Sequence, residues 1–438
     1  MGSTSELVAI ARRCASAQLP ADVITVAKHC VLDWLGVTLA GAREPLARIV
    51  FEQIGRADAG SEATLLGFGA RSSLLTAALV HGTAAHALDF DDTQWGIQGH
   101  PTAPVLSALW GLAERERVSG RALLSAFVTG VEVECHLGRW LNPEHYARGF
   151  HATGTLGTFG AAAAAAQLLG LDAVQWTHAF GLAGTQAAGL KSAFGSMAKP
   201  LHVGKAAQNG LLAALLARGG FTGSTQILDD AQGFAATHAA VAAPLTAADA
   251  NTYEISQTLF KYHAACHLTH ASMEGLLSLL RNEPIAVDEI ERVELSVDAT
   301  CLGVCAIERP ETGLQAKFSL KATAAMVLLG YATEDPATYS DELARSPRLA
   351  QVMAKVHVNV KPMAATRTEL CVRLRGGRTH EVSHDSGIPE RDLAKQGARL
   401  AQKFQRIAPL SAAKSRAVQE CVAALDQLGD VREVVKLL

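Results

Sequence analysis

Carboxylates and imidazoles are concentrated in one short part of the chain, His86-Ala-Leu-Asp89-Phe-Asp91-Asp92-Thr93 followed by His100-Pro101. Three carboxylates within four residues repel one another, which costs free energy unless a function uses them. They follow a helical pattern, and a helix C-terminus also disfavours negative charge. His100 precedes the next helical pattern, where the helix dipole favours a neutral imidazole that can accept a proton. The segment therefore indicates proton transfer. The alternative is one capping Asp with solvated neighbours.

Two further segments carry groups that could bind an anion. In Arg148-Gly-Phe-His151, a Gly-flanked turn enters an uncharged helical pattern, so His151 is either functional or an ordinary capping residue. No carboxylate lies between Asp172 and Asp229, yet this stretch holds the basic residues Lys191, Lys199, Lys205 and Arg218, and His202 lies among them. An acid-free basic stretch predicts an anion site, and its glycine and proline residues predict a loop. The alternative is a chance excess of solvated lysine.

A fourth segment, Lys261-Tyr-His263-Ala-Ala-Cys266-His267-Leu-Thr269-His270, resembles a possible metal site. Three histidines at i, i+4 and i+7 would share one face of a helix and could bind zinc. However, the run is not H-E-x-x-H, and the helical pattern begins only at Ser272, which places the histidines in the preceding loop. We therefore expect no metal, and a metallohydrolase remains an alternative.

Composition and missing motifs narrow the function classes. The 438 residues are 49% hydrophobic and 18% charged, with a net charge of −3, which offers no field to attract nucleic acid or an anionic membrane. The most apolar stretch, 157–169, is too short to span a bilayer. Eight scattered cysteines and a polar N-terminus without a signal-peptide core favour a cytoplasmic protein with reduced thiols.

We find no G-x-S-x-G, Walker A, G-x-G-x-x-G or zincin motif, so the groups left for chemistry are Asp, Thr, His and Lys.

The periodicity predicts a mainly α protein with an inserted α+β domain. Apolar residues at helical spacing predict helices at 75–89, 103–116, 121–141, 155–171 and 204–218, and again at 389–438. Alternation predicts strands at 293–297, 356–360 and 370–374, with a turn at Gly376-Gly377 and a helix at 322–329. One-sided burial of these strands indicates an antiparallel sheet. We expect a large all-helical domain from 1–255 and 391–438, an α+β lid domain at 256–390, and a small-ligand site in the cleft between them.

An ordered set of short motifs resembles the MmgE/PrpD family over nearly the whole chain. The set is His86-Ala-Leu-Asp-Phe-Asp-Asp-Thr93, Gly99-His-Pro101, Gly149-Phe-His151, Ala198-Lys-Pro-Leu-His202, Gly204 with Ala206-Ala207, Lys317-Phe-Ser-Leu320 and Gly387-Ile-Pro389. The family includes 2-methylcitrate dehydratase, cis-aconitate decarboxylase and iminodisuccinate epimerase. The resemblance implies a helical domain with an α+β lid, a homodimer, a small carboxylate substrate, and neither an organic cofactor nor a metal.

The resemblance also implies roles for individual residues. Those expected to be catalytic are Asp89, His100, His151, Lys199 and His267. Those expected to bind substrate are Thr93, Lys191, His202, Lys317 and Cys266. The lid-side histidine of the family corresponds to His267 or, one register away, to Cys266, which could not act as an equivalent base. The spacing from Thr93 to His100 is slightly longer than in the decarboxylases, which bears on the substrate.

All three reactions of the family generate carbanion character beside a carboxylate. We expect a lyase of the hydratase or dehydratase type. An epimerase is the close alternative, because Leu190-Lys191 ahead of Phe194-Gly195-Ser-Met, together with Lys317-Phe-Ser, resembles epimerase-like members. A decarboxylase and a non-catalytic carboxylate-binding protein also remain open. Each catalytic reading requires that His100, His151 and Lys199 meet in one water-poor hollow facing the inserted domain.

Overall fold

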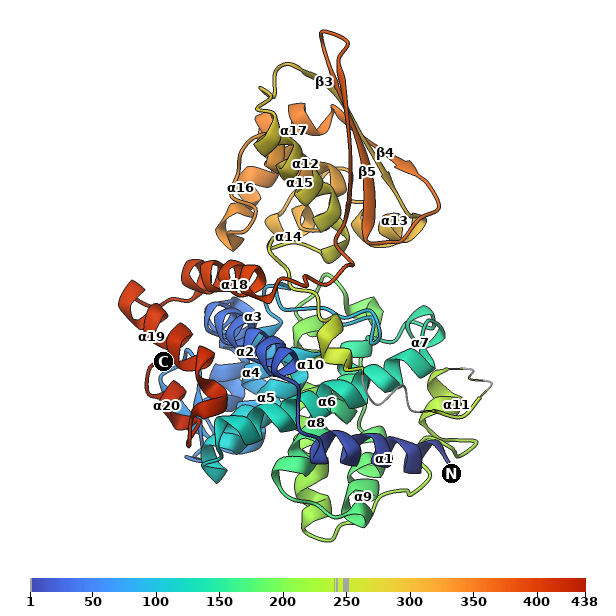
Figure 1. Cartoon of the computed structure of the whole chain (residues 1–438), viewed down its shortest axis with the longest axis vertical. Helices are drawn as coiled ribbons and strands as arrows, with labels where there is room; N and C mark the ends of the chain where they lie inside the picture. The colour runs from blue at the N-terminus through green and yellow to red at the C-terminus, as the bar shows by residue number, and fades with distance from the viewer. Residues whose placement is uncertain (1, 240, 242, 247–251) are drawn as a thin grey trace. The chain divides into compact units, whose positions relative to one another are not determined.

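The computed structural model describes residues 2–239, 241, 243–246 and 252–438 (Figure 1). The expectation of a helical domain over residues 1–255 therefore falls partly outside the described residues. The chain forms two compact units, 1–260 with 390–438, and 261–389. Each unit has its own core.

The first unit is built from helices contributed by both ends of the chain. The N-terminal part holds α1 (Ser3–Ser16), α2 (Ala21–Gly41), α3 (Pro45–Val50) with the π-helical η1 (Phe51–Gly55), α4 (Leu74–Ala85), α5 (Thr102–Glu116), α6 (Gly120–Leu141), α7 (Glu144–Ala147), α8 (Ala152–Leu168), α9 (Ala173–Gly184), η2 (Lys191–Ala193), α10 (Ala198–Arg218), α11 (Phe234–His238) and η3 (Glu254–Gln257). The C-terminal part adds α18 (Leu393–Ile407), α19 (Ala412–Ala423), η6 (Leu425–Gln427) and α20 (Arg432–Val435).

Small residues let the central helices of this unit approach closely. Helix α8 is buried from Ala152 to Ala166 and packs against α5, α6 and α10. Helices α4 and α10 meet at Gly82 and Gly204, where a Cβ on Gly204 would lie 2.3 Å from the Leu79 carbonyl oxygen. Only glycine fits such a crossing without moving a helix. This close crossing places the C-terminal end of α4 beside the N-terminal turns of α10.

Helix α2 is the one helix of the described residues that is long and apolar enough to cross a membrane. It lies near the N-terminus, and 72% of its most apolar stretch is buried within the structure. It packs against α4, α5 and α18, which is typical of a core helix.

Two local predictions for this unit are wrong. The helical part also contains a short antiparallel hairpin, β1 (Ala63–Leu65) and β2 (Ala70–Ser72), so it is not all-helical. Pro200 does not mark a loop, because α10 begins at Ala198 and includes both Lys199 and Pro200. Proline is tolerated in the first turn of a helix, where its missing N–H would have no intrahelical partner.

The second unit holds a four-stranded sheet in the order β4-β3-β5-β6, with helices packed on it (Figure 1). The strands are β3 (Ile290–Val297), β4 (Val356–Val360), β5 (Arg367–Leu374) and β6 (Thr379–Asp385). The helices are η4 (His267–Thr269), α12 (His270–Asn282), α13 (Ala299–Cys305), α14 (Gly313–Ala316), α15 (Leu320–Leu328), η5 (Pro336–Thr338), α16 (Asp341–Ala344) and α17 (Pro347–Met353). Helix α12 contacts β5 and β6, and α15 contacts β4.

The sheet is mixed, so the prediction of a purely antiparallel sheet is wrong. Strand β3 pairs antiparallel with β5, but it pairs parallel with β4, in a register that aligns Val293 with Val356. Parallel neighbours need a long crossover connection. Residues 298–355 supply it, since they contain α13 to α17. Alternating burial of Val293, Leu295 and Val297 reveals one buried face but says nothing about the direction of the neighbouring strand.

Candidate active site

The loop between α4 and α5 carries most of the acidic groups of the candidate site. Helix α4 ends at Ala85, His86 is its C-cap residue, and Asp89 has a left-handed backbone with φ of 52°. The loop returns to α5 through His100, whose backbone N–H donates to Thr153 Oγ1 at 3.1 Å. A Cβ on Gly99 would lie 2.7 Å from that same hydroxyl oxygen, so glycine is needed for this close approach.

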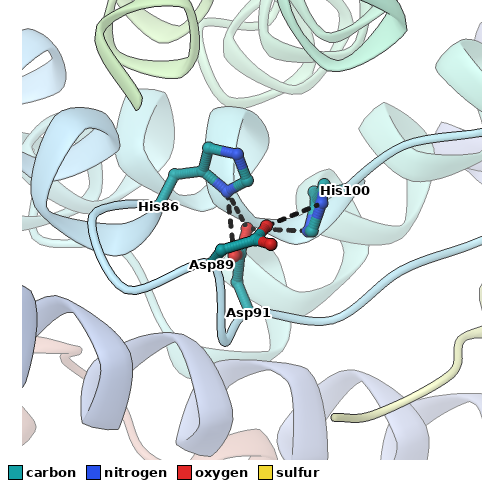
Figure 2. A group of neighbouring side chains, drawn as sticks. All are labelled: His86, Asp89, Asp91 and His100. Atoms are coloured by element: carbon teal, nitrogen blue, oxygen red, sulfur yellow. Dashed lines mark hydrogen bonds and ion pairs between the residues drawn. The ribbon is translucent and has the colours of Figure 1, made fainter. Parts of the chain in front are cut away.

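Asp91 lies between the two imidazoles of this loop (Figure 2). His86 Nδ1 is 2.9 Å from both carboxylate oxygens of Asp91. His100 Nδ1 is 3.2 Å from Asp91 Oδ2, and its Nε2 is 3.6 Å from Asp89 Oδ1. The rings of His86 and His100 meet edge to face with centroids 4.4 Å apart. One carboxylate thus holds two buried imidazoles.

Lys199, from the first turn of α10, joins this group from another part of the chain. Its Nζ donates to Asp89 Oδ1 at 2.7 Å, and it lies 5.2 Å from the ring centroid of Phe194. The ring of His151 packs edge to face on the same Phe194, with centroids 5.0 Å apart. His151 also lies 6.0 Å from the ring of His86. His100, His151 and Lys199 are therefore brought together, as the sequence predicted.

His151 and His202 form a direct imidazole pair. Their Nδ1 atoms are 3.1 Å apart, so one ring must donate and the other accept. His202 lies three residues after Lys199 on the same helix, which places both on one face of α10. The backbone of His151 is fixed by a hydrogen bond from its N–H to the Gly189 carbonyl oxygen at 2.9 Å. The segments 149–151 and 189–191 run side by side here, with an antiparallel bridge between Phe150 and Leu190.

A buried network of hydrogen bonds and ion pairs holds the loop between α4 and α5 in place. Lys403 of α18 donates to the Phe90 carbonyl oxygen at 2.7 Å and lies 2.6 Å from Asp33 Oδ1 of α2. The hydroxyl of Thr102 donates to the carboxylate of Asp92, and so does its backbone N–H at 3.3 Å. The C-terminal segment thus positions the loop through Lys403, while Asp92 caps the start of α5.

Burial divides these groups into neutral and ionised forms. Burial lowers the pKa of His86 to about 4, even though Asp91 opposes this shift. Burial, reinforced by Lys199, lowers the pKa of His151 well below its usual value. Burial alone would raise the pKa of Asp91, but its contacts with His100 and His86 hold that pKa well below its usual range. Burial and the neighbouring Asp33 raise the pKa of Asp92 to about 8. At neutral pH the set offers neutral imidazoles beside an ionised Asp91.

Two other residues of the first unit that were predicted to bind substrate contact backbone oxygens of neighbouring segments. The backbone of Thr93 pairs with Leu259 through two hydrogen bonds of 2.8 Å, and its hydroxyl is 3.5 Å from the Leu259 carbonyl oxygen. Lys191 donates from Nζ to the Tyr146 carbonyl oxygen at 3.1 Å and lies 3.7 Å from that residue's ring centroid.

The remaining predicted residues belong to the second unit. The buried Cys266 donates from its backbone N–H to the Lys317 carbonyl oxygen at 3.0 Å. His267 Nε2 lies 3.1 Å from the Ser386 carbonyl oxygen, and its ring stacks on His270 with centroids 5.0 Å apart. Lys317 Nζ lies 5.6 Å from the ring centroid of Tyr339. The three histidines do not share a helix, because α12 begins only at His270.

Four residues of the first unit offer ligand atoms close enough to approach one metal ion. They are His86, Asp89, Asp91 and His100, whose ligand atoms lie within 4.8 Å of one another (Figure 2). However, the Lys199 ammonium already bonds to Asp89, and His86 Nδ1 already bonds to both oxygens of Asp91. The residues therefore fit a hydrogen-bonded acid–base set better than a metal-ligand set.

The sequence interpretation gave no role to His86 or Asp91. Both lie inside the motif that it singled out, and the mutual repulsion of three nearby carboxylates was the available signal. The structure shows that the three have different partners, with Lys199 beside Asp89, His86 and His100 beside Asp91, and Thr102 beside Asp92. The arrangement can hold an anion near an ammonium and move protons through imidazoles.

Comparisons with known proteins agree with this picture. The family model of the MmgE/PrpD N-terminal domain matches residues 5–244, and that of the MmgE/PrpD C-terminal domain matches residues 263–427. The chain is 28% identical to cis-aconitate decarboxylase of Mus musculus over 435 residues, covering 94% of this chain and 87% of the relative. It is 29% identical to cis-aconitate decarboxylase of Homo sapiens, covering 87% and 83%. It is 25% identical to cis-aconitate decarboxylase of Aspergillus terreus, covering 100% and 96%.

Proposed function

Because the chain belongs to the MmgE/PrpD family, we propose that it is a lyase that decarboxylates a small tricarboxylate resembling cis-aconitate. The observation that carries this proposal is the meeting of Lys199, His100 and His151 around two carboxylates of one loop. The relatives, all named for cis-aconitate decarboxylation, favour this reaction over the dehydration expected from the sequence motifs. A sequence identity of 25–29% supports a small tricarboxylate as the class of substrate. It gives weaker support to cis-aconitate itself as the substrate.

The proposed reaction uses the ammonium for binding and an imidazole for proton transfer. Lys199 and His151, with Thr93, bind carboxylates of the substrate through charge-assisted hydrogen bonds. The bond between the substrate carbon and the departing carboxylate breaks, and its electron pair stays on that carbon. Carbon dioxide leaves, and the carbon takes a proton from His100. His100 then regains a proton from solvent, so that one proton is consumed for each carbon dioxide released.

Epimerisation of a small dicarboxylate is the second candidate. Leu190-Lys191 ahead of Phe194-Gly195-Ser-Met favours it, because this segment resembles epimerase-like members of the family. The structure places Phe194 between His151 and Lys199, so the segment belongs to the candidate site. In this reaction one imidazole removes the proton from the substrate carbon, and a second group returns a proton to the opposite face.

Incubation in deuterium oxide, followed by proton NMR, separates these functions. The acids to be supplied are cis-aconitate, citrate, 2-methylcitrate and iminodisuccinate. Loss of cis-aconitate with deuterium in the product and release of carbon dioxide supports decarboxylation. New vinyl signals from a citrate indicate dehydration, and exchange without net conversion of the dicarboxylate indicates epimerisation. If none of the four acids exchanges or converts, the proposed function is rejected for them.

We further propose that the enzyme acts in the cytoplasm as a homodimer without a metal or an organic cofactor. Light scattering of the purified protein tests the dimer. Dialysis against a chelator tests the metal: turnover should be unchanged, whereas loss that zinc or another divalent ion restores would favour a metalloenzyme. The set His86, Asp89, Asp91 and His100 would then be the first to examine.

A further inference from the structure

The two contacts that His86 and His100 make with Asp91 both use Nδ1. His86 Nδ1 lies 2.9 Å from each oxygen of Asp91, and His100 Nδ1 lies 3.2 Å from Oδ2 (Figure 2). Asp91 is 2% exposed, so water does not compete strongly for its oxygens. An ionised carboxylate can only accept hydrogen bonds. His86 must therefore carry its proton on Nδ1, and a proton on His100 Nδ1 would let His100 donate to the same carboxylate.

The second ring nitrogen of each histidine is left as a proton acceptor. His86 Nε2 is buried and has no hydrogen-bond partner within the described ranges, which suits an unprotonated nitrogen better than an N–H. His100 Nε2 lies 3.6 Å from Asp89 Oδ1, the carboxylate oxygen that binds Lys199. Of the two imidazoles on Asp91, only His100 presents its Nε2 to the ammonium that would bind a substrate.

The contact between His100 and Asp91 is close but not aligned as a hydrogen bond, since His100 Nδ1 has no aligned partner among the residues described. Catalytic hydrogen bonds are often loose without substrate and tighten in the complex. His86, by contrast, is already bonded to both oxygens. That bond fixes the carboxylate of Asp91 in the orientation that His100 needs.

We propose that Asp91 is a positioning residue, which holds His100 in the Nδ1–H tautomer and so directs Nε2 toward the substrate, while His86 anchors the carboxylate. This inference rests on the proposed function. In either candidate reaction the proton moves between the substrate carbon and His100 Nε2, and Nδ1 keeps its proton throughout. Asp89, His86 and His151 also lie close to His100.

Replacement of Asp91 by asparagine tests this role. The amide oxygen can accept from one Nδ1–H, but its NH₂ group then faces the other ring and can only donate. A share of His100 must change to the Nε2–H tautomer, which cannot accept a proton at Nε2. We expect Asp91→Asn to lower kcat by about 100-fold, the scale of general acid–base catalysis, with little change in KM. The pH profile of kcat/KM should also change, because the catalytic imidazole loses its neighbouring carboxylate.

Asp92→Asn is the matched control. It removes a buried carboxyl group from the adjacent position of the same loop, but its partner is Thr102 and not an imidazole. We expect Asp92→Asn to keep the pH profile of the unmodified enzyme. Unchanged kcat and an unchanged profile in folded Asp91→Asn would overturn the inference. An equal shift in Asp92→Asn would overturn it too, because the effect would then come from loop charge in general.

The tautomer of His100 in the unmodified protein provides a test that does not depend on the substrate. Nitrogen-15 NMR of labelled histidine distinguishes the two neutral tautomers, and loss of one set of signals in His100→Gln assigns His100. We expect the Nδ1–H tautomer for His100 at a pH where it is neutral. The Nε2–H tautomer would refute the positioning role, even if turnover were demonstrated. If none of the candidate acids reacts, that result counts against the proposed function. It does not affect the tautomer test, which is decided by the NMR signals of His100 alone.

Discussion

Lys199 and Asp89 form an ion pair in which the ammonium nitrogen lies 2.7 Å from a carboxylate oxygen. Both side chains are largely buried, at 12% and 13% exposure. They come from positions 110 residues apart, and the pair joins the start of α10 to the loop after α4. Because His100 Nε2 approaches the same oxygen of Asp89, the pair holds the cation beside the proton-transfer group.

Replacement of Lys199 by methionine should abolish most of the activity. The change removes the cation that would bind a substrate carboxylate and leaves Asp89 facing an anionic substrate. Loss of one partner of a close charge pair typically costs 2–5 kcal/mol, so we expect kcat/KM to fall by about 30-fold or more. Turnover of each candidate acid, with thermal unfolding as a check of folding, measures this.

Lys205→Met is the control for that change. Lys205 lies on the same helix but is exposed and bonds to Gln208. Its replacement should leave kcat/KM unaltered. If Lys199→Met weakens binding of a carboxylate while no turnover exists to be lost, the protein is a carboxylate-binding protein and not an enzyme.

The pair of His151 and His202 predicts a graded effect. His202→Phe keeps an aromatic ring but removes the hydrogen bond between the two Nδ1 atoms. A single hydrogen bond contributes about 0.5–1.5 kcal/mol, so kcat/KM should fall between about 2-fold and 10-fold. His151→Phe should have the larger effect, because His151 would itself contact the substrate. Steady-state kinetics of both variants test the order, and a greater loss in His202→Phe would contradict it.

Local sequence patterns indicated which residues form the candidate site, but they did not indicate which of these residues contact one another. The motifs around His100, His151 and Lys199 are short and lie in turns or at helix starts, where residue type and position are informative. The roles of His86 and Asp91 depend on how the loop from 86 to 100 folds, including the left-handed backbone at Asp89. No periodicity describes such a loop, since Asp tolerates both conformations. Partner choice among three adjacent carboxylates is therefore a tertiary property.

The fold shows the same division between local and long-range information. Apolar spacing predicted α5 and α6 to within a residue, because apolar residues at helical spacing are a feature of the local sequence. The parallel pairing of β3 with β4 could not be predicted from the local sequence, because it depends on the path of the crossover between the two strands. The buried position of Lys403 was not predicted either, because a lysine in an amphipathic helix normally faces solvent.

Buried histidines should make the protein unstable in mild acid. His81 Nε2 accepts a hydrogen bond from the Leu66 N–H at 3.0 Å, and burial lowers the pKa of His81 from 6.5 to about 4. Above pH 6.5 the ring is neutral in both states, and the full stability is present. As the pH falls from 6.5 to 4, the unfolded chain binds a proton that the folded chain refuses, and roughly 3 kcal/mol is lost.

His81→Gln tests this contribution. The change in unfolding free energy between pH 7 and pH 5, measured in urea, should be smaller in the variant by about 2 kcal/mol. An equal change in both proteins would mean that His81 does not titrate differently on folding. The variant's own loss at pH 7 cancels, because only the difference between the two pH values is compared.

Lys403 should be required for both stability and activity. Its ammonium lies 2.6 Å from Asp33 Oδ1 and 2.7 Å from the Phe90 carbonyl oxygen, and all three groups are buried. Lys403→Met removes the ammonium that pairs with Asp33, and breaking a buried ion pair costs about 3–5 kcal/mol. Replacing Asp33 by leucine as well should restore most of that stability, because apolar groups can substitute for a buried pair.

Activity should not recover with stability. Phe90 lies between Asp89 and Asp91, so loss of the bond to its carbonyl oxygen frees the loop that presents both carboxylates. We expect the Lys403→Met/Asp33→Leu protein to unfold near the unmodified protein in urea yet to keep a reduced kcat. A double-mutant cycle on unfolding free energy and kcat separates the two effects. Full recovery of kcat would show that Lys403 only balances the charge of Asp33 and does not position the loop.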